Sequence, residues 1–600
     1  MAVVQQRTPG VYFEPIDPAP RRITQVRSDI VGFVGVAERG PLNRPVKIRS
    51  WTQYLTRFGG RFPDGLLPSA VYGFFENGGD TCWVVRVGNP APWARKASLV
   101  FDNLWEHQVL RVEALDYGVG AHRILVRVKR LGDNRFTLFV QRESQREETW
   151  RGLSMAPQDP RYFGRLVNGE GPRVSQVDQF EVPDESNREN LPSFRGSVLI
   201  RLQNIGGASL GNPVPSRVRA RTDAVEGFLG DKTVPGSVEA SPILDNLSLE
   251  DFIGEQDLRS LENPKGLACM ASIPEVSIVA IPDLVWTEPA PAPREPEKMR
   301  SCRSLKPQEG PPRTHPQQSD SPPVRRKPLS PGDQLEGHRA IIRHCASLRD
   351  RFGLIDPRPG DQNPNEVMRL AKDLQSQPGQ FVALYYPWLI VEDPTRADFG
   401  VRDVPPSGHI AGVMARVDLS VGVQKPPANE PIFGAVGVVS EFDHETHGQL
   451  NDASVNAIVA APGRGIRPAG ARTLVDRENR EWLFINVRRL LIVIEESIEE
   501  STQWVVFEPN TPARRRDLDR VVRNYLDDLW RRGRLAGGVA EEAYSVICDE
   551  STNPPEEVER GRLICQIGVR PPLPAEFVVV RVGKTLEQAG TVAEGRSTGG

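Results

Sequence analysis

The sequence predicts a multidomain protein of the α+β or mixed α/β class, and three of its segments support that prediction. Residues 276–391 alternate strand patterns with helix patterns, an order that favours a partly parallel sheet. Residues 91–250 instead hold short strand patterns between charged loops, which indicates a β-rich insertion in the middle of the chain. Residues 481–548 contain the strongest helical periodicity. A length of 600 residues suggests about four domain-sized units.

Composition limits the classes of function. The 75 basic and 78 acidic residues nearly cancel to a formal charge of −3, which gives no support for binding to nucleic acid or to a membrane surface. No window approaches the roughly 18 apolar residues of a membrane span, and the first residues lack a signal-peptide pattern. The six cysteines form no CxxC pair, so we expect reduced thiols in a protein made in the cytoplasm.

The first 90 residues predict a small α/β unit. Strand patterns at 30–36 and 82–87 flank helical patterns at 51–58 and 69–77, each of which stops at paired glycines. This unit has too few apolar residues to form a stable core by itself. In the insertion that follows, we expect strands at 109–112, 124–128, 136–140 and 197–202 and a helical stretch from 247–254.

Residues 383–440 are the expected centre of the chain. The run ALYYPWLIV belongs to a predicted buried strand at 381–391, which follows a strand at 276–281. The residues between these two strands contain predicted helices at 337–352 and 365–375.

Two further features of this centre carry predictions. Residues 405–408, Pro-Pro-Ser-Gly, suit a fixed turn. The small apolar run 410–417 contains Gly412, which predicts that another backbone approaches closely there. By contrast, residues 287–332 are rich in Pro, Arg, Ser and Gln and cannot bury a core, so they predict a disordered or loosely ordered surface loop.

The last quarter of the chain contains two strong helices. Residues 481–500 are apolar on most sides and predict a largely buried helix. Thr511 and Pro512 form an N-cap and first helical position for a second, amphipathic helix that ends before Gly533. Strands are expected at 504–507, 544–548 and 563–569.

Both chain ends carry a strand pattern held by prolines. Residues 11–13 lie between Pro9 and Pro15, and residues 577–582 (FVVVRV) follow a polyproline spacer that is about 15 Å long. The backbone N–H and C=O groups of such strands need partners. Two interpretations stay open on these grounds: the strands complete an internal sheet, or they are arms that pair with other subunits.

Three patterns resemble catalytic or ligand sites but do not meet their requirements. In DHETH at 443–447 the histidines are three apart, whereas a zinc-protease helix needs four, so we expect a surface loop. The glycine-rich residues 461–470 lack the Gly-Lys-Ser/Thr of a phosphate loop and are also expected to form a loop. Asp283 follows a strand, but no base or nucleophile can be named beside it. We therefore assign no catalytic, metal-binding or cofactor-binding residue and expect no enzyme activity.

Several long blocks together resemble the contractile tail sheath family, from phage tails and related bacterial contractile injection systems. They include TPGVYFEPI, FVGVAERGPLNRPVKIRSWTQYLTRFGG and AVYGFFENGGDTCWVVRV near the start of the chain. The central segments ALYYPWLIVEDP and VPPSGHIAGVMARVD, then INVRRLLIVIEESIEESTQWVVFEPN and AEFVVVRVGKT, also resemble it. The resemblance covers roughly residues 8–90, 150–170 and 245–585.

The resemblance implies a helical sleeve of identical subunits around an inner tube, joined to baseplate and tail terminator or cap proteins. It implies a common inner domain built from both chain ends and strand arms that enter the sheets of neighbouring subunits. The arm residues are then Val11, Tyr12, Phe13, Glu14, Phe577, Val578, Val579, Val580 and Arg581. Such a particle would be made in the bacterial cytoplasm.

The expected organisation follows from the patterns and the resemblance together. It comprises an arm at 1–20, the N-terminal part of the core at 21–90, the outer insertion at 91–250, an α/β sheath domain at 251–470, a C-terminal inner domain at 471–570, and a second arm with a tail at 571–600.

The crowding of basic residues on the second C-terminal helix suggests a surface that meets acidic residues of the tube. The residues concerned are Arg514, Arg516, Arg520 and Arg523. A solvated face, or one paired within the subunit, is the competing interpretation. For the whole protein, the alternatives are a non-contractile scaffold or cap of the same fold, and an α/β hydrolase-like enzyme that uses Asp283 and the 443–447 segment.

Overall fold

The computed structural model describes most of the chain in ordered segments. These are residues 22–60, 65–90, 95–102, 107–117, 124–131, 135–142, 148–168, 197, 199–205, 224–229, 243–255, 264–287, 326–375, 378–392 and 400–576. The expected arms at 11–14 and 577–581 therefore lie outside the described residues.

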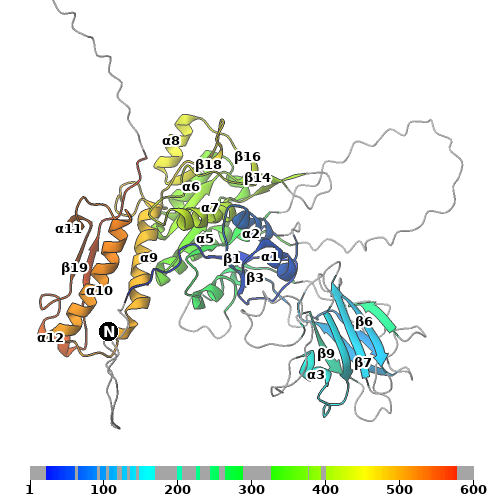
Figure 1. Cartoon of the computed structure of the whole chain (residues 1–600). Coiled ribbons are helices and arrows are strands. Elements are labelled where there is room, and N and C mark those ends of the chain that lie inside the picture. The colour runs from blue at the N-terminus through cyan, green and yellow to red at the C-terminus, as the bar shows by residue number, and fades with distance from the viewer. Residues whose placement is uncertain are drawn as a thin grey trace, which may run out of the picture.

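An eight-stranded sheet forms the centre of the molecule, and it joins segments that are far apart in the sequence (Figure 1). Its two edge strands are antiparallel to their neighbours, and the strands between them run parallel. In spatial order the strands are β18 (Gly465–Pro468), β17 (Val455–Ala461), β13 (Val382–Tyr386), β12 (Phe352–Ile355), β11 (Ile278–Ala280), β1 (Val31–Gly35), β3 (Cys82–Arg86) and β2 (Val46–Ile48).

This order confirms the partly parallel sheet and explains why the first 90 residues lack a core. Strands β1, β2 and β3 complete the sheet that β11 to β13 begin, so both groups share the same two layers of buried side chains.

Helices cover both faces of the sheet because alternate strand residues point to opposite sides. One face packs against α5 (Pro331–Leu348) and α6 (Pro364–Leu374), and the other packs against α2 (Leu67–Glu76) and α7 (Ser407–Ser420). Three short elements complete this part: α1 (Trp51–Phe58), α4 (Leu249–Ile253) and α8 (His444–Asp452).

The β-rich insertion consists of two sheets that share one apolar core, and it lies at the opposite side of the molecule from the C-terminal helices (Figure 1). One sheet contains β4 (Ser98–Asp102), β5 (Gln108–Ala114) and β9 (Ile200–Asn204); the other contains β10 (Ala224–Phe228), β6 (Ile124–Leu131), β7 (Arg135–Arg142) and β8 (Glu148–Ser154). A short helix, α3 (Phe163–Leu166), packs beside them. Strands β4 and β8 were not expected from the sequence.

The predicted strand at 381–391 is in fact two strands in different sheets. Strand β13 ends at Tyr386, and Pro387 has no N–H with which to continue a ladder. The chain then enters β14 (Leu389–Glu392), which pairs with β15 (Val401–Val404) and β16 (Ala435–Val438).

Other local predictions also need correction. Residues 443–447 begin helix α8, because the Asp443 side chain accepts a hydrogen bond from the Thr446 N–H and caps it. Of residues 461–470, expected to form a loop, Gly465–Pro468 form strand β18, and only the turn at 462–464 and residues 469–470 lie outside strands. Residues 504–507 are not a strand: Gln503–Val505 is a 3-10 turn. The expected helix 337–352 begins earlier, at Pro331, and ends at Leu348, before the unexpected strand β12.

Asp283 lies at the end of β11 and holds three segments together through one fully buried carboxylate. It accepts hydrogen bonds from the backbone N–H groups of Val36 at 2.8 Å, Leu66 at 2.9 Å and Leu67 at 3.1 Å. It also pairs with the buried guanidinium of Arg326 at 2.7 Å. These contacts give Asp283 a structural role, because they join the end of β1, the start of α2 and Arg326 to the segment that follows β11.

The prediction of a loosely ordered loop at 287–332 is wrong for its last residues, which include the buried Arg326. Its guanidinium stacks over Trp286 at 4.8 Å and donates to the Asp283 backbone carbonyl at 2.7 Å. Residues 331 and 332 are already in α5, whereas residues 288–325 lie outside the described part of the chain. The buried Arg326 therefore attaches the described residues before α5 to the core.

Replacing Asp283 with alanine should lower the free energy of unfolding by about 3–5 kcal/mol, because it leaves a buried guanidinium without its carboxylate and three buried N–H groups without an acceptor. Denaturant unfolding followed by circular dichroism measures this loss. Asp452→Ala is the control: its carboxylate pairs with Arg477 at 2.8 Å on the surface, so the change should stay within about 1 kcal/mol. Equal losses in the two variants would contradict the role of Asp283.

Helices α2 and α7 pack with almost no space between their backbones, as Gly412 predicts. A Cβ atom at Gly412 would lie 2.5 Å from the Phe74 carbonyl oxygen, and one at Gly408 would lie 2.3 Å from the Ala70 Cα. Only glycine permits this approach at these two positions. The expected turn at 405–408 is instead the entry into α7, which begins at Ser407.

Gly412→Ala should therefore destabilise the protein by about 1–3 kcal/mol, since the added methyl group forces α2 and α7 apart. Gly448→Ala makes the same chemical change in α8, where no atom lies within 4 Å of the new Cβ, and should be neutral or stabilise by up to about 1 kcal/mol. Thermal unfolding of both variants tests the pair. Melting temperatures that shift in the same direction would refute the close-packing explanation.

Candidate assembly surface

The C-terminal unit is built on two long helices, α9 (Ile485–Ser501) and α10 (Pro512–Arg531). The Thr511 side chain accepts a hydrogen bond from the Arg514 N–H, and Pro512 occupies the first turn, so the predicted start of α10 is confirmed. The helices enclose an apolar core with a two-stranded sheet of β19 (Tyr544–Ile547) and β20 (Gln566–Val569). Short helices α11 (Ala540–Ala543) and α12 (Pro555–Glu559) flank the strands.

The first described residues of the chain lie along α9. The N–H groups of Thr24 and Val26 donate to the side-chain oxygens of Ser501 at 3.1 Å and Ser497 at 3.0 Å. Ile23 and Val26 also pack against the apolar core of the C-terminal unit. The chain therefore enters the molecule at the C-terminal end of α9.

A buried ion pair continues this contact. Arg489 of α9 pairs with Asp418 of α7 at 2.6 Å and donates to the Ser28 carbonyl at 2.8 Å. Burial raises the pKa of Asp418, while the Arg489 charge opposes that shift. These bonds connect the N-terminal segment, the central domain and α9 at one point.

The other end of the described chain leaves near the opposite end of α9. After β20, the Pro572 carbonyl accepts a hydrogen bond from the Asn486 side chain at 3.0 Å. Glu576 then forms a two-bond ion pair with the nearly buried Arg472 at 2.9 and 2.6 Å. The proline spacer is therefore docked on its own chain as far as Glu576, rather than held away from it as the sequence suggested.

These two anchors fix where each expected arm begins. Helix α9 has 17 residues and is about 25 Å long, and the segments that lead to the arms contact its opposite ends. The two described segments thus leave the C-terminal unit at different ends of α9.

The sheet of β19 and β20 has two outer edges. Within the described residues each strand pairs only with the other. The Arg570 N–H donates to the Ala543 carbonyl at 2.8 Å, and hydrogen bonding alternates along an antiparallel ladder, so Ile567 and Val569 direct their backbone groups to the outer edge of β20. On the outer edge of β19, the Val546 carbonyl accepts a hydrogen bond from the Arg523 side chain.

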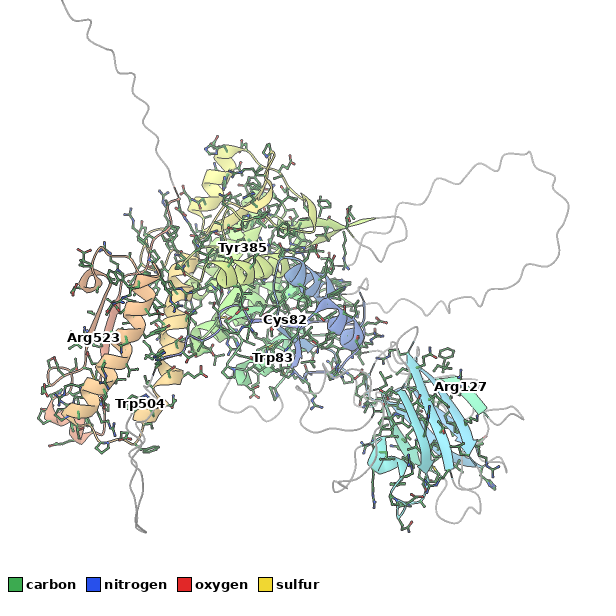
Figure 2. The ribbon with its side chains drawn as sticks, viewed as in Figure 1. Cys82, Trp83, Arg127, Tyr385, Trp504 and Arg523 are labelled. Carbon is green, nitrogen blue, oxygen red and sulfur yellow. The ribbon has the colours of Figure 1, made fainter. Side chains whose placement is uncertain are left out.

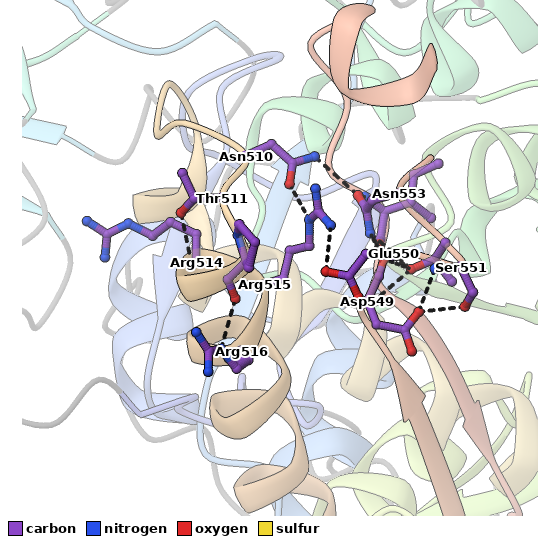
Figure 3. Close-up of polar contacts among 12 residues, drawn as sticks. Asn510, Thr511, Arg514, Arg515, Arg516, Asp549, Glu550, Ser551 and Asn553 are labelled. Carbon is purple, nitrogen blue, oxygen red and sulfur yellow. Dashed lines mark hydrogen bonds and ion pairs between the residues drawn. The ribbon is translucent and has the colours of Figure 1, made fainter. Parts of the chain in front are cut away.

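The four arginines expected to face a tube all lie on α10, and three of them are paired within the chain. Figure 2 labels Arg523, and Figure 3 labels Arg514 and Arg516. Arg514 pairs with Glu508 at 3.0 Å, Arg520 with Asp517 at 2.9 Å, and Arg523 with Asp519 at 2.7 Å. Arg516 donates to the Pro512 carbonyl at 3.2 Å, and no carboxylate among the described residues lies within ion-pair distance of it.

The neighbouring Arg515 has a different role from the other arginines of the cluster. It is buried, donates to the Asn510 side chain at 2.6 Å and lies 3.5 Å from Glu550 (Figure 3). Its burial follows from its position on the inner side of the first turn, which the helical spacing could have shown.

The described ranges contain no cluster of three or more His, Cys, Asp or Glu side chains arranged to hold a metal ion. In the same ranges, no helix combines the length and the apolar character that crossing a bilayer requires.

Two models of known protein families match this chain. Residues 338–474 match the phage tail sheath protein central domain, and residues 477–584 match the phage tail sheath C-terminal domain. Both models describe domains of tail sheath proteins. The chain carries both of these domains, so the resemblance inferred from its sequence is confirmed.

Individual relatives agree with these two matches. The tail sheath protein of Vibrio phage KVP40 is 26% identical over 191 residues, which cover 31% of this chain and 27% of the phage protein. The tail sheath protein of Burkholderia phage BcepMu is 28% identical over 221 residues, which cover 36% of this chain and 45% of that protein. The chain thus matches less than half the length of these curated relatives.

The fold also resembles a solved sheath tail protein from Desulfitobacterium hafniense. The two structures align with a TM-score of 0.50 over 90% of this chain and 94% of the other, at 10% identity. At that identity the likeness concerns the fold alone.

Proposed function

We propose that this protein is the subunit of a contractile sheath, which polymerises helically around an inner tube and contracts to drive the tube through a target envelope. The observation that carries the proposal is the C-terminal unit: both ends of the described chain are anchored to α9, beside a sheet whose two outer edges have no strand partner among the described residues.

In this proposal the arms of neighbouring copies supply the missing strands. Residues 577–581 of one copy and residues 11–14 of another each add to an edge of the β19–β20 sheet. A two-stranded sheet is marginal by itself, and two added strands would bring it to a stable size. The seven residues between Glu14 and Arg22 can span at most about 27 Å, which is comparable with the length of α9.

Such a contact generates an open helix because its two sides differ. An arm on one copy meets an edge on the next, and a head-to-tail contact that does not close produces a filament. Backbone pairing between strands can persist while the subunit bodies rotate on the linkers. Contraction is then the passage of a metastable extended lattice to one with more buried contact, and the inner tube, the baseplate and a terminal cap protein are the partners.

The enzyme alternative gains no support from the geometry of Asp283, because its carboxylate already binds three backbone N–H groups and Arg326. A non-contractile scaffold or cap of the same fold would form lattices of a single pitch, so the pitch before and after contraction separates it from the proposal.

Val579→Pro tests the arm directly. Proline cannot donate a ladder hydrogen bond, so the variant should stay folded but lose polymerisation, with sedimentation as a single subunit and no tubes in negative-stain micrographs. Thr591→Pro, placed beyond the expected strand, is the matched control and should polymerise as the unaltered protein does. Tubes formed equally well by both variants would refute the proposal that residues 577–581 are an arm.

A second part of the proposal concerns the inner tube. The basic face of α10 is proposed to meet acidic tube residues, and Arg516, which has only a carbonyl partner among the described residues, is the strongest candidate. The Arg516→Glu/Arg520→Glu variant should then polymerise but fail to assemble around the tube. Arg531→Glu/Arg532→Glu reverses two charges at the other end of the same helix and serves as the control. Unchanged co-sedimentation of tube and sheath in the first variant would eliminate this contact.

A further inference from the structure

Two cysteines face each other at the loop end of the β19–β20 sheet. The register pairs Val546 with Ile567 and Ile547 with Gln566, so the next position on each strand brings Cys548 opposite Cys565. The alternation of the ladder makes this a position without backbone hydrogen bonds between the two residues, where side chains come closest. Cα separations at such positions are about 4.5 Å, at the short end of the range that disulfides span.

A second observation agrees with the register. The Cys565 thiol lowers the pKa of Cys548, and the Cys548 thiol raises that of Cys565, so the two side chains lie close to each other. Both residues are free thiols; Cys548 is buried and Cys565 is half-buried. The pair therefore needs no rearrangement of the backbone to come together.

The surroundings hold the pair in place. The Asn553 side chain donates to the Ile564 carbonyl and accepts from its N–H, each at 2.8 Å, which fixes the strand just before Cys565. Asn510 links Asn553 to the buried Arg515 (Figure 3). The loop of 549–564 is thus closed by these contacts even without a covalent bond.

Their chemistry also favours oxidation at this pair over the other described cysteines. The neighbouring Cys565 thiol lowers the pKa of Cys548; the Arg515 charge acts in the same direction, and burial and the Asp519 and Asp549 charges oppose it without reversing it. Burial instead raises the pKa of Cys269 and of Cys345 to about 12, and it raises that of Cys82. Since the thiolate is the reactive form, Cys548 is the preferred nucleophile among the cysteines that the structure describes.

We propose that Cys548 and Cys565 are a redox site that forms an intramolecular disulfide when the protein meets hydrogen peroxide. The Cys548 thiolate attacks one peroxide oxygen, the O–O bond breaks, and after proton transfer a sulfenic acid and one water result. The Cys565 sulfur then attacks the sulfenic sulfur, and the hydroxyl leaves with the Cys565 proton as a second water. Two thiols are oxidised and one peroxide is reduced to two waters.

The consequence is a covalent bond across the sheet that the proposed function assigns to the neighbouring arms. The thiols stay reduced inside a cell and would cross-link after exposure to an oxidant outside it. In the assembled particle, the bond would then link β19 to β20 covalently, within the sheet whose edges are proposed to receive the arms. This consequence rests on the proposed function, whereas the disulfide itself does not.

The test uses the full chain with Cys302→Ser, which removes the cysteine that lies outside the described residues. After peroxide treatment of the folded protein, free thiols are alkylated under denaturing conditions, and peptides are analysed by non-reducing mass spectrometry. We expect a Cys548–Cys565 cross-linked peptide two hydrogens lighter than its separate parts, with Cys82, Cys269 and Cys345 alkylated. Recovery of both thiols as alkylated cysteines, or as sulfinic acids without a cross-link, would overturn the proposal.

Thermal unfolding supplies a second measurement. The oxidised protein should melt about 5 °C above the reduced one, and dithiothreitol should reverse the shift, because the bond closes a loop in the unfolded chain. Cys548→Ser and Cys565→Ser should each abolish the peroxide-dependent shift. A cross-link in a protein that never forms tubes would contradict the sheath proposal alone, and tubes without a cross-link would contradict the redox site alone.

Discussion

The buried carboxylate of Asp283 is the interaction on which the arrangement of the central domain depends. It follows a strand from the middle of the chain, yet its hydrogen bonds reach the end of β1, the start of α2 and Arg326 at the entrance to α5. A buried charge is tolerated only where donors surround it, so the three segments have to meet at this point. The parallel sheet can then combine β1 and β3 with strands that follow them by about 200 residues or more.

Helix α9 plays the corresponding part in the C-terminal unit. Its hydroxyl groups at Ser497 and Ser501 bind the N-terminal segment, its Arg489 binds Asp418, and Asn486 binds the proline spacer. A single rigid element therefore links the central domain to both routes by which the chain leaves the described structure. This arrangement agrees with the proposal that subunits exchange strands while each body stays intact, because the described anchors all lie within one body.

Predictions from the sequence are correct where one local interaction decides the structure. Thr511 and Pro512 begin a helix, and Gly412 permits close approach of two helices. Predictions are wrong where contacts with residues from other segments decide the structure. The apolar run through Pro387, for example, divides between two sheets. The helix that follows Asp443 is a different case, because its cap is a local hydrogen bond from the Thr446 N–H that the sequence prediction overlooked. Short strands such as β12 are too brief for their periodicity to be recognised.

By itself, the sequence determined the alternation of strands and helices, the β-rich insertion, the two long C-terminal helices and the likeness to tail sheath proteins. These follow from periodicity, capping residues and long matching segments, all of which are local or linear properties. Only the tertiary structure decided that the first 90 residues complete a sheet begun elsewhere, that three of the α10 arginines are paired within the chain, and that Cys548 meets Cys565. The sheet and the cysteine pair depend on contacts between separate segments, and such contacts are set by packing and register rather than by any pattern within one segment. The arginine pairs are local, three to six residues apart, and the sequence allowed them without deciding between them and a contact with the tube.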